Sequence, residues 1–407
     1  PNRQLADAVV GLLKGKEEFV MIDEQKVVFE EAMHLAAEAK GGKKQVYIVE
    51  GGPGTGKSVV AINLLARLTG KRELVHYVSR NSAPRDVYSH RLAGHKRRAE
   101  IKSLFKNSGA YVEGTKDTFS CLIVDEAHRL NEKSGLYGNL GDHQIKEIIR
   151  AAKCSVFFLD EDQRVALKDI GSKAEIAHWA DHHGAEVTTA ELPSQFRCNG
   201  SNGYIAWLDN VLQIRETANK TLQGINYDFK VFDSAAELRD AIVAKNANNG
   251  ARLLAGYCWP WKSKKHPDAF DICFPEADFK MRWNLTDDGN LWILTPSSID
   301  QIGCVHTCQG LELEYAGVII GPDLTMGSGG SLKTDPAKRA KHDKTVRGWM
   351  TLAEQDPERA RKLTDQIIKN TYRVLMSRGM KGCYVYATDE SLREYLREAS
   401  VDSSGDS

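Results

Sequence analysis

A glycine-rich run in the first quarter of the chain has the residue types that cradle phosphate groups. Glycines let a backbone curl so that its N–H groups point at phosphate oxygens. Lys57 would neutralise the β- and γ-phosphates of ATP, and the Ser58 hydroxyl would ligate Mg²⁺. The run fits G-x-x-x-x-G-K-[ST] at every fixed position and comprises Gly51, Gly52, Pro53, Gly54, Thr55, Gly56, Lys57 and Ser58.

The segments on either side of this loop support a nucleotide site. An apolar strand is expected over 46–49, and an apolar helix is expected from Val59 to Leu68. The positive end of that helix, which Val59 helps to form, favours phosphate groups. Strand, loop and helix in this order predict a binding loop for ATP and Mg²⁺ rather than a chance glycine-rich turn.

Two carboxylates end the next apolar run, Leu122-Ile-Val-Asp125-Glu126-Ala-His128. Asp125 would hold Mg²⁺ through water, and Glu126 would orient and deprotonate the attacking water. The pair therefore predicts hydrolysis of the bound nucleotide. For His128 two interpretations stay open, because this residue could couple the site to a partner or cap the local structure.

A third apolar strand, over 155–159, also ends in polar residues. In a parallel sheet its carboxyl end faces the same crevice as Asp125. Gln163, which follows this strand, could therefore sense the γ-phosphate. An ordinary polar loop is the alternative.

Three further runs lie in the second half of the chain. They are Gln195-Phe-Arg197, His306-Thr307-Cys-Gln309-Gly310-Leu311-Glu312 and Asn370-Thr-Tyr-Arg-Val-Leu-Met-Ser377-Arg378-Gly379. Each alone could be an ordinary surface segment. Together, and in this order, they resemble the motif series of superfamily 1 helicases.

That resemblance implies roles for individual residues. Arg197 and Arg378 would reach the γ-phosphate from a second domain, and Glu312 would take the ribose hydroxyl. Gln163 matches the glutamine of the G-D-x-x-Q motif, although Leu159-Asp160 replaces Gly-Asp. Gln25 resembles the glutamine that reads adenine. The residues implied to contact a nucleic acid strand are Arg80, Asn81 and Thr307.

More narrowly, the chain resembles the Schlafen group 3-like DNA/RNA helicase domain family over roughly residues 20–390. The resemblance implies an ATPase more strongly than an unwinding enzyme. The family often carries a separate N-terminal domain, so an attached effector domain or partner protein is also implied. The stretches that carry the resemblance are 49–58, 124–130, 195–198, 255–261, 306–323 and 370–386.

Length and composition set the limits of this interpretation. The 407 residues fit two domains, and 55 Lys+Arg balance 55 Asp+Glu. A neutral total does not exclude nucleic acid, because a cleft needs only local positive charge. The sequence holds no apolar stretch long enough for a membrane span. Eight cysteines without a CxxC pair indicate a reducing, cytoplasmic setting and no zinc site.

Short buried strands that alternate with helices predict an α/β fold. We expect two RecA-like P-loop NTPase domains with parallel sheets and an ATP cleft between them. A basic helix is expected over 91–106, and strands are expected at 74–78, 251–257, 291–294, 318–320 and 382–386. Trp259, Trp261 and Trp283 would form a core or stack nucleic acid bases. The expected divisions are a helical lead-in over 1–40, domains over 41–188 and 189–398, a Trp-rich insertion near 256–292, a charged excursion near 325–365 that starts in a flexible loop, and a disordered tail over 399–407.

The function that these motifs favour is a superfamily 1 helicase- or translocase-type ATPase, coupled to single-stranded DNA or RNA. An alternative is an ATP-gated regulatory module that controls an attached effector, such as a nuclease, without unwinding. A metabolic kinase would leave Arg197, Arg378 and the 309–312 run unexplained.

Overall fold

A computed structural model gives the fold, and the chain separates into two compact units. The first consists of Pro1–Arg164 and Lys168–Gln195, and the second of Val165–Leu167 and Phe196–Ser407. The structure describes residues 21, 23–80, 103–135, 138–193, 202–284, 292, 295–308 and 313–401.

The first unit is built on a six-stranded sheet in which every pairing is parallel. Its strand order is β3-β2-β4-β5-β1-β6. The inner strands β4 and β5 read as nearly unbroken apolar runs because helices cover both faces of the sheet. The strands are β1 Gln45–Gly51, β2 Val75–Val78, β3 Phe105–Lys106, β4 Phe119–Val124, β5 Ala152–Leu159 and β6 Glu186–Leu192.

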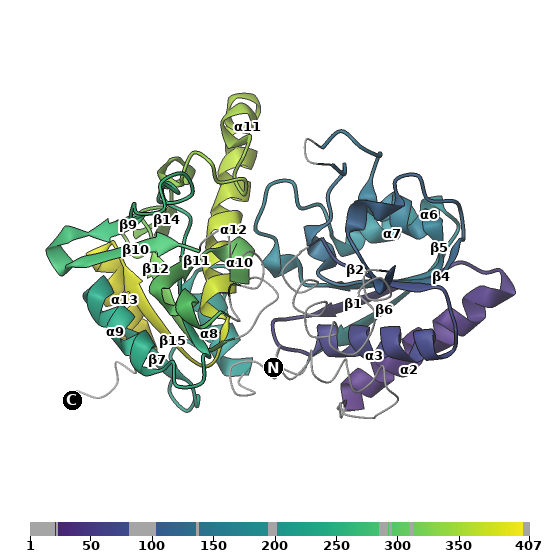
Figure 1. Ribbon diagram of the computed structural model, residues 1–407, viewed down its shortest axis with the longest axis horizontal. Coiled ribbons are helices and arrows are strands. Elements are labelled where there is room, and N and C mark those ends of the chain that lie inside the picture. Colours follow the sequence, from purple (N-terminus) through teal and green to yellow (C-terminus); the bar gives the residue numbers. More distant parts are fainter. Residues whose placement is uncertain are drawn as a thin grey trace. The chain divides into compact units, whose positions relative to one another are not determined.

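Helices cover both faces of this sheet (Figure 1). One face carries α2 (Asp23–Glu38) and α3 (Lys57–Gly70), and the other carries α6 (Gln144–Ala151) and α7 (Lys173–His182). Apolar residues of α6 and α7 pack on β1, β4 and β5 in one buried cluster. The short 3-10 helices are η1 Ala39–Gly41, η2 Ser108–Tyr111, η3 Ala127–Arg129 and η4 Glu161–Gln163.

The second unit holds a seven-stranded sheet with the order β7-β15-β12-β8-β11-β10-β9. Its pairings are parallel except for the β9–β10 hairpin. Another hairpin, β13–β14, forms a separate two-stranded sheet. The strands are β7 Asp228–Val231, β8 Ala251–Ala255, β9 Ile272–Phe274, β10 Phe279–Trp283, β11 Gln301–Gly303, β12 Leu313–Ile320, β13 Leu324–Met326, β14 Leu332–Thr334 and β15 Gly379–Ala387.

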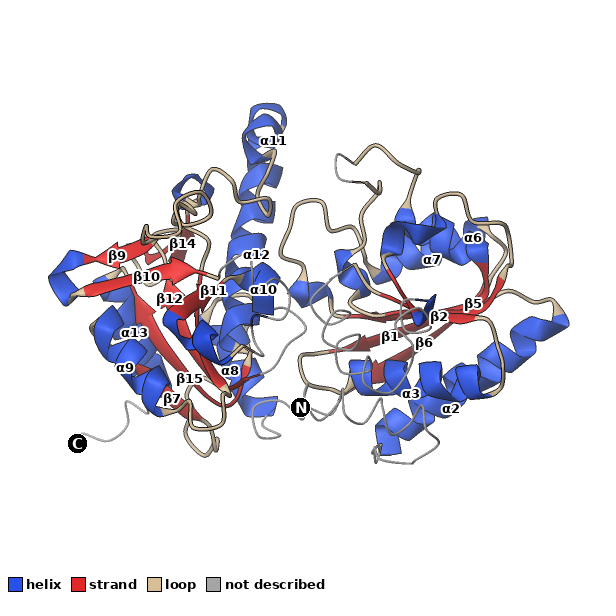
Figure 2. Cartoon of the chain, viewed as in Figure 1, coloured by secondary structure: helices blue, strands red, loops and turns tan. Residues whose placement is uncertain are grey.

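Helices also pack against this second sheet (Figure 2). Apolar residues of α9 join β8, β12 and β15 in one core cluster. The α-helices are α8 Asn202–Val211, α9 Ala235–Ala244, α10 Val305–Cys308, α11 Trp349–Gln355, α12 Pro357–Met376 and α13 Glu390–Ser400. The 3-10 helices are η6 Pro275–Ala277, η8 Pro296–Asp300 and η9 Pro336–Lys338.

The predicted α/β class with a parallel sheet in each half of the chain is confirmed. Helix α2 begins earlier than expected, and β6 lies wholly within the first unit because it pairs with β1 along its full length. The predicted domain limits stay predictions. Of the strand expected over 291–294, only Trp292 is among the described residues, and it lies in a 3-10 turn.

The structure differs locally from the predictions at three places. Of the basic helix expected over 91–106, residues 103–104 are helical, whereas residues 105–106 form strand β3, which pairs with β2; residues 81–102 lie outside the described part. The run 327–330, expected to begin the charged excursion as a loop, is the turn between the paired strands β13 and β14. The tail was expected from residue 399, but α13 continues to Ser400, and Trp207 Nε1 donates to the Ala399 carbonyl.

Charged residues of the second unit form a buried cluster around Arg339. Its guanidinium contacts the carboxylates of Asp323, at 3.0 Å, and Asp343, and all three side chains are buried. Thr345 donates its hydroxyl to Asp343, and the Tyr372 hydroxyl donates to Asp323. Burial alone would lower the pKa of Arg339, but the two carboxylates outweigh it and raise that pKa.

We expect Arg339→Met to destabilise the protein by about 3–5 kcal/mol, because two carboxylates would remain buried without their cation. Urea denaturation of the full chain measures the change. The neighbouring exposed residue provides a control, and Lys338→Met should change stability by no more than about 0.5 kcal/mol. A loss below about 1 kcal/mol for Arg339→Met would show that the cluster does not hold the second unit together.

Candidate nucleotide-binding site

The parallel sheet of the first unit brings the predicted motifs to one edge. In the strand register, Val124 of β4 is level with Val78 of β2 and Phe157 of β5, and Phe158 is level with Val49 of β1. The carboxyl ends of these strands therefore lie side by side. The segments that follow them at this edge are 52–56, 79–80, 125–128 and 160–163, where ligands of open α/β sheets bind.

The phosphate loop connects β1 directly to α3. Gly54 and Gly56 have φ of 77° and 86°, left-handed values that a residue with a side chain rarely adopts. Thr55 closes the turn through its hydroxyl, which donates to the Gly52 carbonyl at 3.0 Å. The buried Lys57 ammonium donates to the carbonyls of Gly51 and Gly52, so it lies within the curl of the loop.

Helix α2 supports this loop through Gln25. The side chain is buried, and its amide donates to the Thr55 carbonyl at 3.1 Å. A Cβ added to Gly56 would lie 2.0 Å from Gln25 Nε2 and would displace the end of that side chain, while the φ of 86° by itself favours glycine. The structure thus places Gln25 against the loop backbone, and its role in reading adenine stays a prediction.

Ser58 and Asp125, the two predicted Mg²⁺ ligands, are in contact. The Ser58 hydroxyl donates to Asp125 Oδ2 at 2.8 Å, and the Glu126 N–H donates to Oδ1 at 3.0 Å. Tyr77 donates a further hydrogen bond to Oδ2. Burial, and next the Glu126 charge, raise the pKa of Asp125, whereas Tyr77, Ser58 and Lys57 oppose the shift. Two hard oxygen ligands in a buried, negatively charged position fit Mg²⁺.

Glu126 is linked to the neighbouring strand through His128. Its backbone is left-handed, with φ of 55°, and its carboxylate lies 3.0 Å from His128 Nε2. His128 is fully buried, and its Nδ1 accepts from the Asp160 N–H at 3.3 Å. Because Nδ1 accepts, a neutral ring carries its proton on Nε2, beside the carboxylate. Burial of the ring favours the local role of His128 over contact with a partner.

Gln163 belongs to the same group of side chains. It is buried in η4 and donates from Nε2 to Asp160 Oδ2 at 2.9 Å. Asp160 Oδ1 accepts from the Asp162 N–H and fixes the turn. Asp160 therefore joins the side chain expected to sense the γ-phosphate to the ring that contacts Glu126.

Sequence reasoning missed two residues of this site. Tyr77 occupies an ordinary position in strand β2, and only the tertiary fold brings its hydroxyl to Asp125. Gly171 lies against the turn after Glu126, where an added Cβ would be 1.9 Å from the Ala127 carbonyl oxygen. The only sequence signals were an aromatic hydroxyl near a strand end and an isolated glycine in a loop.

Arg80 was predicted to contact nucleic acid. Its guanidinium donates to the Arg129 carbonyl and to the buried Asp169 carboxylate, each at 3.2 Å. Burial lowers the pKa of Arg80 to about 10; Arg129 adds to the shift, and Asp169 opposes it. Asn81 lies outside the described residues. A contact from either residue to a strand stays a prediction.

The remaining predicted residues belong to the second unit. Arg378 is buried and donates from Nε to the Val374 carbonyl at 2.8 Å. Thr307 is half-buried in α10, and its hydroxyl donates to Asn284 Oδ1 at 3.0 Å. Arg197 and Glu312 lie outside the described residues. The roles of these four residues stay predictions.

Of the tryptophans of the insertion, Trp283 is a core residue, whereas Trp259 and Trp261 are buried only in part. Trp283 is fully buried, and its Nε1 donates to the Trp259 carbonyl at 3.2 Å. Trp259 and Trp261 are partly buried against the same cluster. Only part of each of these two rings reaches solvent.

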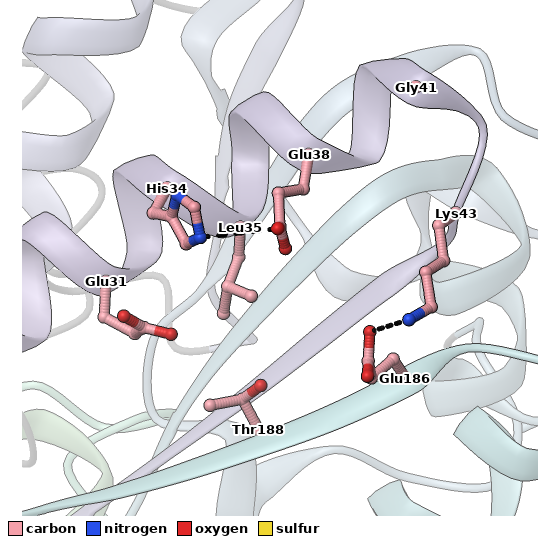
Figure 3. Close-up of a pocket in the computed structure, with 8 residues that line it drawn as sticks. All are labelled: Glu31, His34, Leu35, Glu38, Gly41, Lys43, Glu186 and Thr188. Carbon is pink, nitrogen blue, oxygen red and sulfur yellow. Dashed lines mark ion pairs between the residues drawn. The ribbon is translucent and has the colours of Figure 1, made fainter.

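A surface groove lies at the opposite edge of the first sheet (Figure 3). Lys43 precedes β1 and Glu186 begins β6, so the groove lies at the amino ends of strands whose carboxyl ends carry the phosphate loop. Glu31, Glu38 and Glu186 line it, and the Lys43 charge is paired with Glu186. Carboxylates repel phosphate groups, so this groove is not the nucleotide site.

The first unit therefore has the architecture of a P-loop nucleotide-binding protein: a glycine-rich loop between strand and helix, with a buried carboxylate bonded to the loop serine. The family model of the Schlafen group 3, DNA/RNA helicase domain matches residues 44–389. The chain belongs to this family, as the motif resemblance predicted.

Individual relatives are more distant. A Saccharomyces cerevisiae protein, the uncharacterized YPL245W, is 25% identical over 401 residues, which cover 87% of this chain and 84% of the yeast protein. The Pif1 helicase from Candida albicans is similar at 12% identity and a TM-score of 0.37, with 93% of this chain and 98% of that chain covered. Bacteroides Pif1 bound to ssDNA gives 10% identity and a TM-score of 0.36, over 90% and 92%.

Arterivirus nonstructural protein 10, a helicase solved with DNA, is similar at 11% identity and a TM-score of 0.35. The match covers 90% of this chain but only 65% of the viral protein. TM-scores this low carry no argument about function. Within the described ranges, none of the helices has the length and apolar character that a membrane crossing needs.

We expect His128→Ala to lower the rate of ATP hydrolysis by about 10- to 100-fold with little change in KM, because Glu126 would lose the group that orients it. His128→Gln should recover part of the rate, since its amide can donate to the carboxylate and accept from Asp160. In a Glu126→Gln background the His128 change should add almost nothing. Equal losses in both backgrounds would show that His128 does not act through Glu126.

Gly171→Ala is expected to lower hydrolysis at least about tenfold and to cost about 1–3 kcal/mol of stability, because its methyl group would collide with the Ala127 backbone. Gly70→Ala is the matched control, since nothing lies within 4 Å of a Cβ at that position. Turnover and thermal unfolding measured on both variants provide the comparison. A fully active Gly171→Ala protein would mean that the 126–128 turn tolerates displacement.

Proposed function

We propose that this protein is an ATP-dependent nucleic acid motor of the superfamily 1 helicase or translocase type. It hydrolyses ATP to ADP and phosphate, and turnover is coupled to binding of single-stranded DNA or RNA. The observation that carries the proposal is the 2.8 Å hydrogen bond between Ser58 and Asp125, with Glu126 adjacent in the chain. This contact unites the phosphate loop with the acidic residues that hydrolysis requires.

The contacts within the first unit support the following roles for its residues. Lys57 leaves the carbonyls of its own loop to neutralise the β- and γ-phosphates, and the loop N–H groups bind the remaining oxygens. Ser58 and Asp125 would hold Mg²⁺, which when bound would neutralise charge on the phosphate oxygens. Glu126 accepts a proton from the attacking water, while Gln163 contacts the γ-phosphate.

The second unit would complete the motor. From the motif resemblance, Arg197 and Arg378 stabilise charge at the γ-phosphate, and Glu312 binds the ribose. Removing an arginine in such a role commonly costs about 10³–10⁵ in rate. Hydrolysis would remove these contacts. The bound nucleotide would then no longer favour one conformation of the motor over the other.

We expect single-stranded nucleic acid to stimulate ATP turnover, and we expect both Lys57→Ala and Glu126→Gln to reduce that turnover to a small residual rate. Loss of the general base should cost about 10²–10⁴ in rate. Glu126→Gln should still bind labelled ATP, because it keeps the loop, whereas Lys57→Ala should bind it weakly. The assay is phosphate release with and without an oligonucleotide, and chelation of Mg²⁺ should stop it.

Lys71→Ala provides a matched control, since this lysine is exposed at the end of α3. Turnover that survived either active-site change would refute the assignment of the site. Normal turnover that ignores both DNA and RNA would favour the ATP-gated regulatory module over a motor. Displacement of a strand from a tailed duplex then distinguishes a helicase from a translocase.

A further inference from the structure

The segment between β14 and α11 carries an exposed basic residue at every third position. These residues are Lys338, Lys341, Lys344 and Arg347, and we refer to them as the cationic strip. Most of the residues between them are buried, among them Ala340, Thr345 and Val346, whereas His342 is exposed. The segment therefore lies flat on the second unit and presents one charged side to solvent.

Buried charges hold this segment in place. Arg339 lies inside the strip's sequence and is paired with Asp323 and Asp343, so its own charge is neutralised internally. Asp343 is the single acidic residue of 336–348 and is itself buried. Within the described chain, no acidic side chain pairs with the four residues of the strip. Some other exposed lysines differ in this respect: Lys381, for example, pairs with Glu314 at 3.0 Å.

A second group of cations is attached next to the strip. The Ala340 N–H donates to the Tyr257 carbonyl at 2.9 Å, which fixes the strip beside the start of the Trp-rich insertion. That insertion exposes Lys262, Lys264 and Lys265. The buried Asp271 accepts from both the N–H and the hydroxyl of Ser263 and thereby anchors the lysine run.

An aromatic ring accompanies these cations. The Lys264 ammonium lies 5.5 Å from the centre of the Trp261 ring, which is only partly buried. Anchored cations beside a partly exposed indole suit a ligand that has both phosphates and flat bases. An acidic peptide or an anionic membrane would use the charges but would not need the ring.

We propose that the cationic strip binds the sugar-phosphate backbone of single-stranded nucleic acid, with Trp261 available to a neighbouring base. The inference rests on the proposed function, because the strand it binds is the one on which the motor acts. It adds a binding surface that no helicase motif supplies. The lysine and arginine side chains neutralise phosphates and release the counterions condensed on the strand.

The test replaces all four residues of the strip with Gln and measures binding of labelled oligothymidylate and oligouridylate by fluorescence anisotropy. Each lost phosphate contact should reduce the slope of log affinity against log salt by about 0.7. Four contacts therefore predict a slope smaller by about 3. Between 50 and 200 mM salt, the ratio of wild-type to variant affinity should shrink by about 50-fold. ATP turnover without nucleic acid should not change.

Two further variants control for charge and folding. Replacing Lys220, Lys230, Lys381 and Arg397 with Gln removes the same formal charge from other exposed sites on the second unit and should leave the salt slope nearly unchanged. Exchanging Lys and Arg within the strip keeps its charge and should keep binding within about threefold of wild type, by the same counterion argument. Equal thermal unfolding midpoints show that the variants are folded.

The outcomes separate this inference from the proposed function. If the Gln variant loses oligonucleotide binding while nucleic acid does not stimulate wild-type turnover, the strip is a binding surface but the protein is not a nucleic acid motor. If the variant keeps wild-type affinity and salt slope while nucleic acid still stimulates its turnover, the proposed motor function is supported and the strip is only a solvated surface. A wild-type protein that binds neither oligonucleotide would refute the proposed role of the strip. The same conclusion would follow from a variant that loses binding to phosphatidylserine vesicles but retains oligonucleotide binding.

Discussion

The buried carboxylate of Asp125 is the group on which the candidate site depends. It accepts hydrogen bonds from Ser58 at the start of α3, from Tyr77 at the end of β2 and from the Glu126 backbone. A buried carboxylate is costly unless its oxygens are bonded, so these three elements are constrained to meet at one point. The phosphate loop and the turn that carries Glu126 therefore cannot move independently. A cation at this point would relieve the same electrostatic cost that raises the pKa of Asp125.

The sequence was sufficient for the parts of the site that depend on local pattern. Apolar runs followed by glycines or carboxylates located β1, β4 and β5, and parallel pairing then placed their ends together. Tyr77 and Gly171 could not be found in this way, because their importance comes from what the tertiary fold places against them. The same reason explains strand β3, because pairing with β2 makes a strand of residues 105–106 although their spacing was read as helical. Roles assigned to Arg197, Glu312 and Asn81 still rest on the motif order alone.

The second unit shows why charge in a sequence is a poor guide to exposure. Residues 325–365 were expected to form a polar excursion, yet Arg339, Asp323 and Asp343 are buried together. Arg339 is buried with partners four and 16 residues away along the chain, and composition does not reveal such pairing. Within residues 336–348, the internal pairing leaves Lys338, Lys341, Lys344 and Arg347 as the exposed charges. The neutral total of the chain thus conceals a locally positive surface.

The hydrogen bond from Gln25 to Thr55 bears on where a functional module begins. The segment that defines the family starts at residue 44, whereas α2 ends at Glu38. Yet α2 buries Val28, Ala32 and Leu35 within the first unit and supports the phosphate loop from outside that segment. A recombinant fragment or natural domain fusion cut at the family boundary would keep the phosphate loop, Asp125 and Glu126 but would lose Gln25, which supports that loop. The boundary of the family segment and the boundary of the packed first unit therefore lie at different residues of this chain.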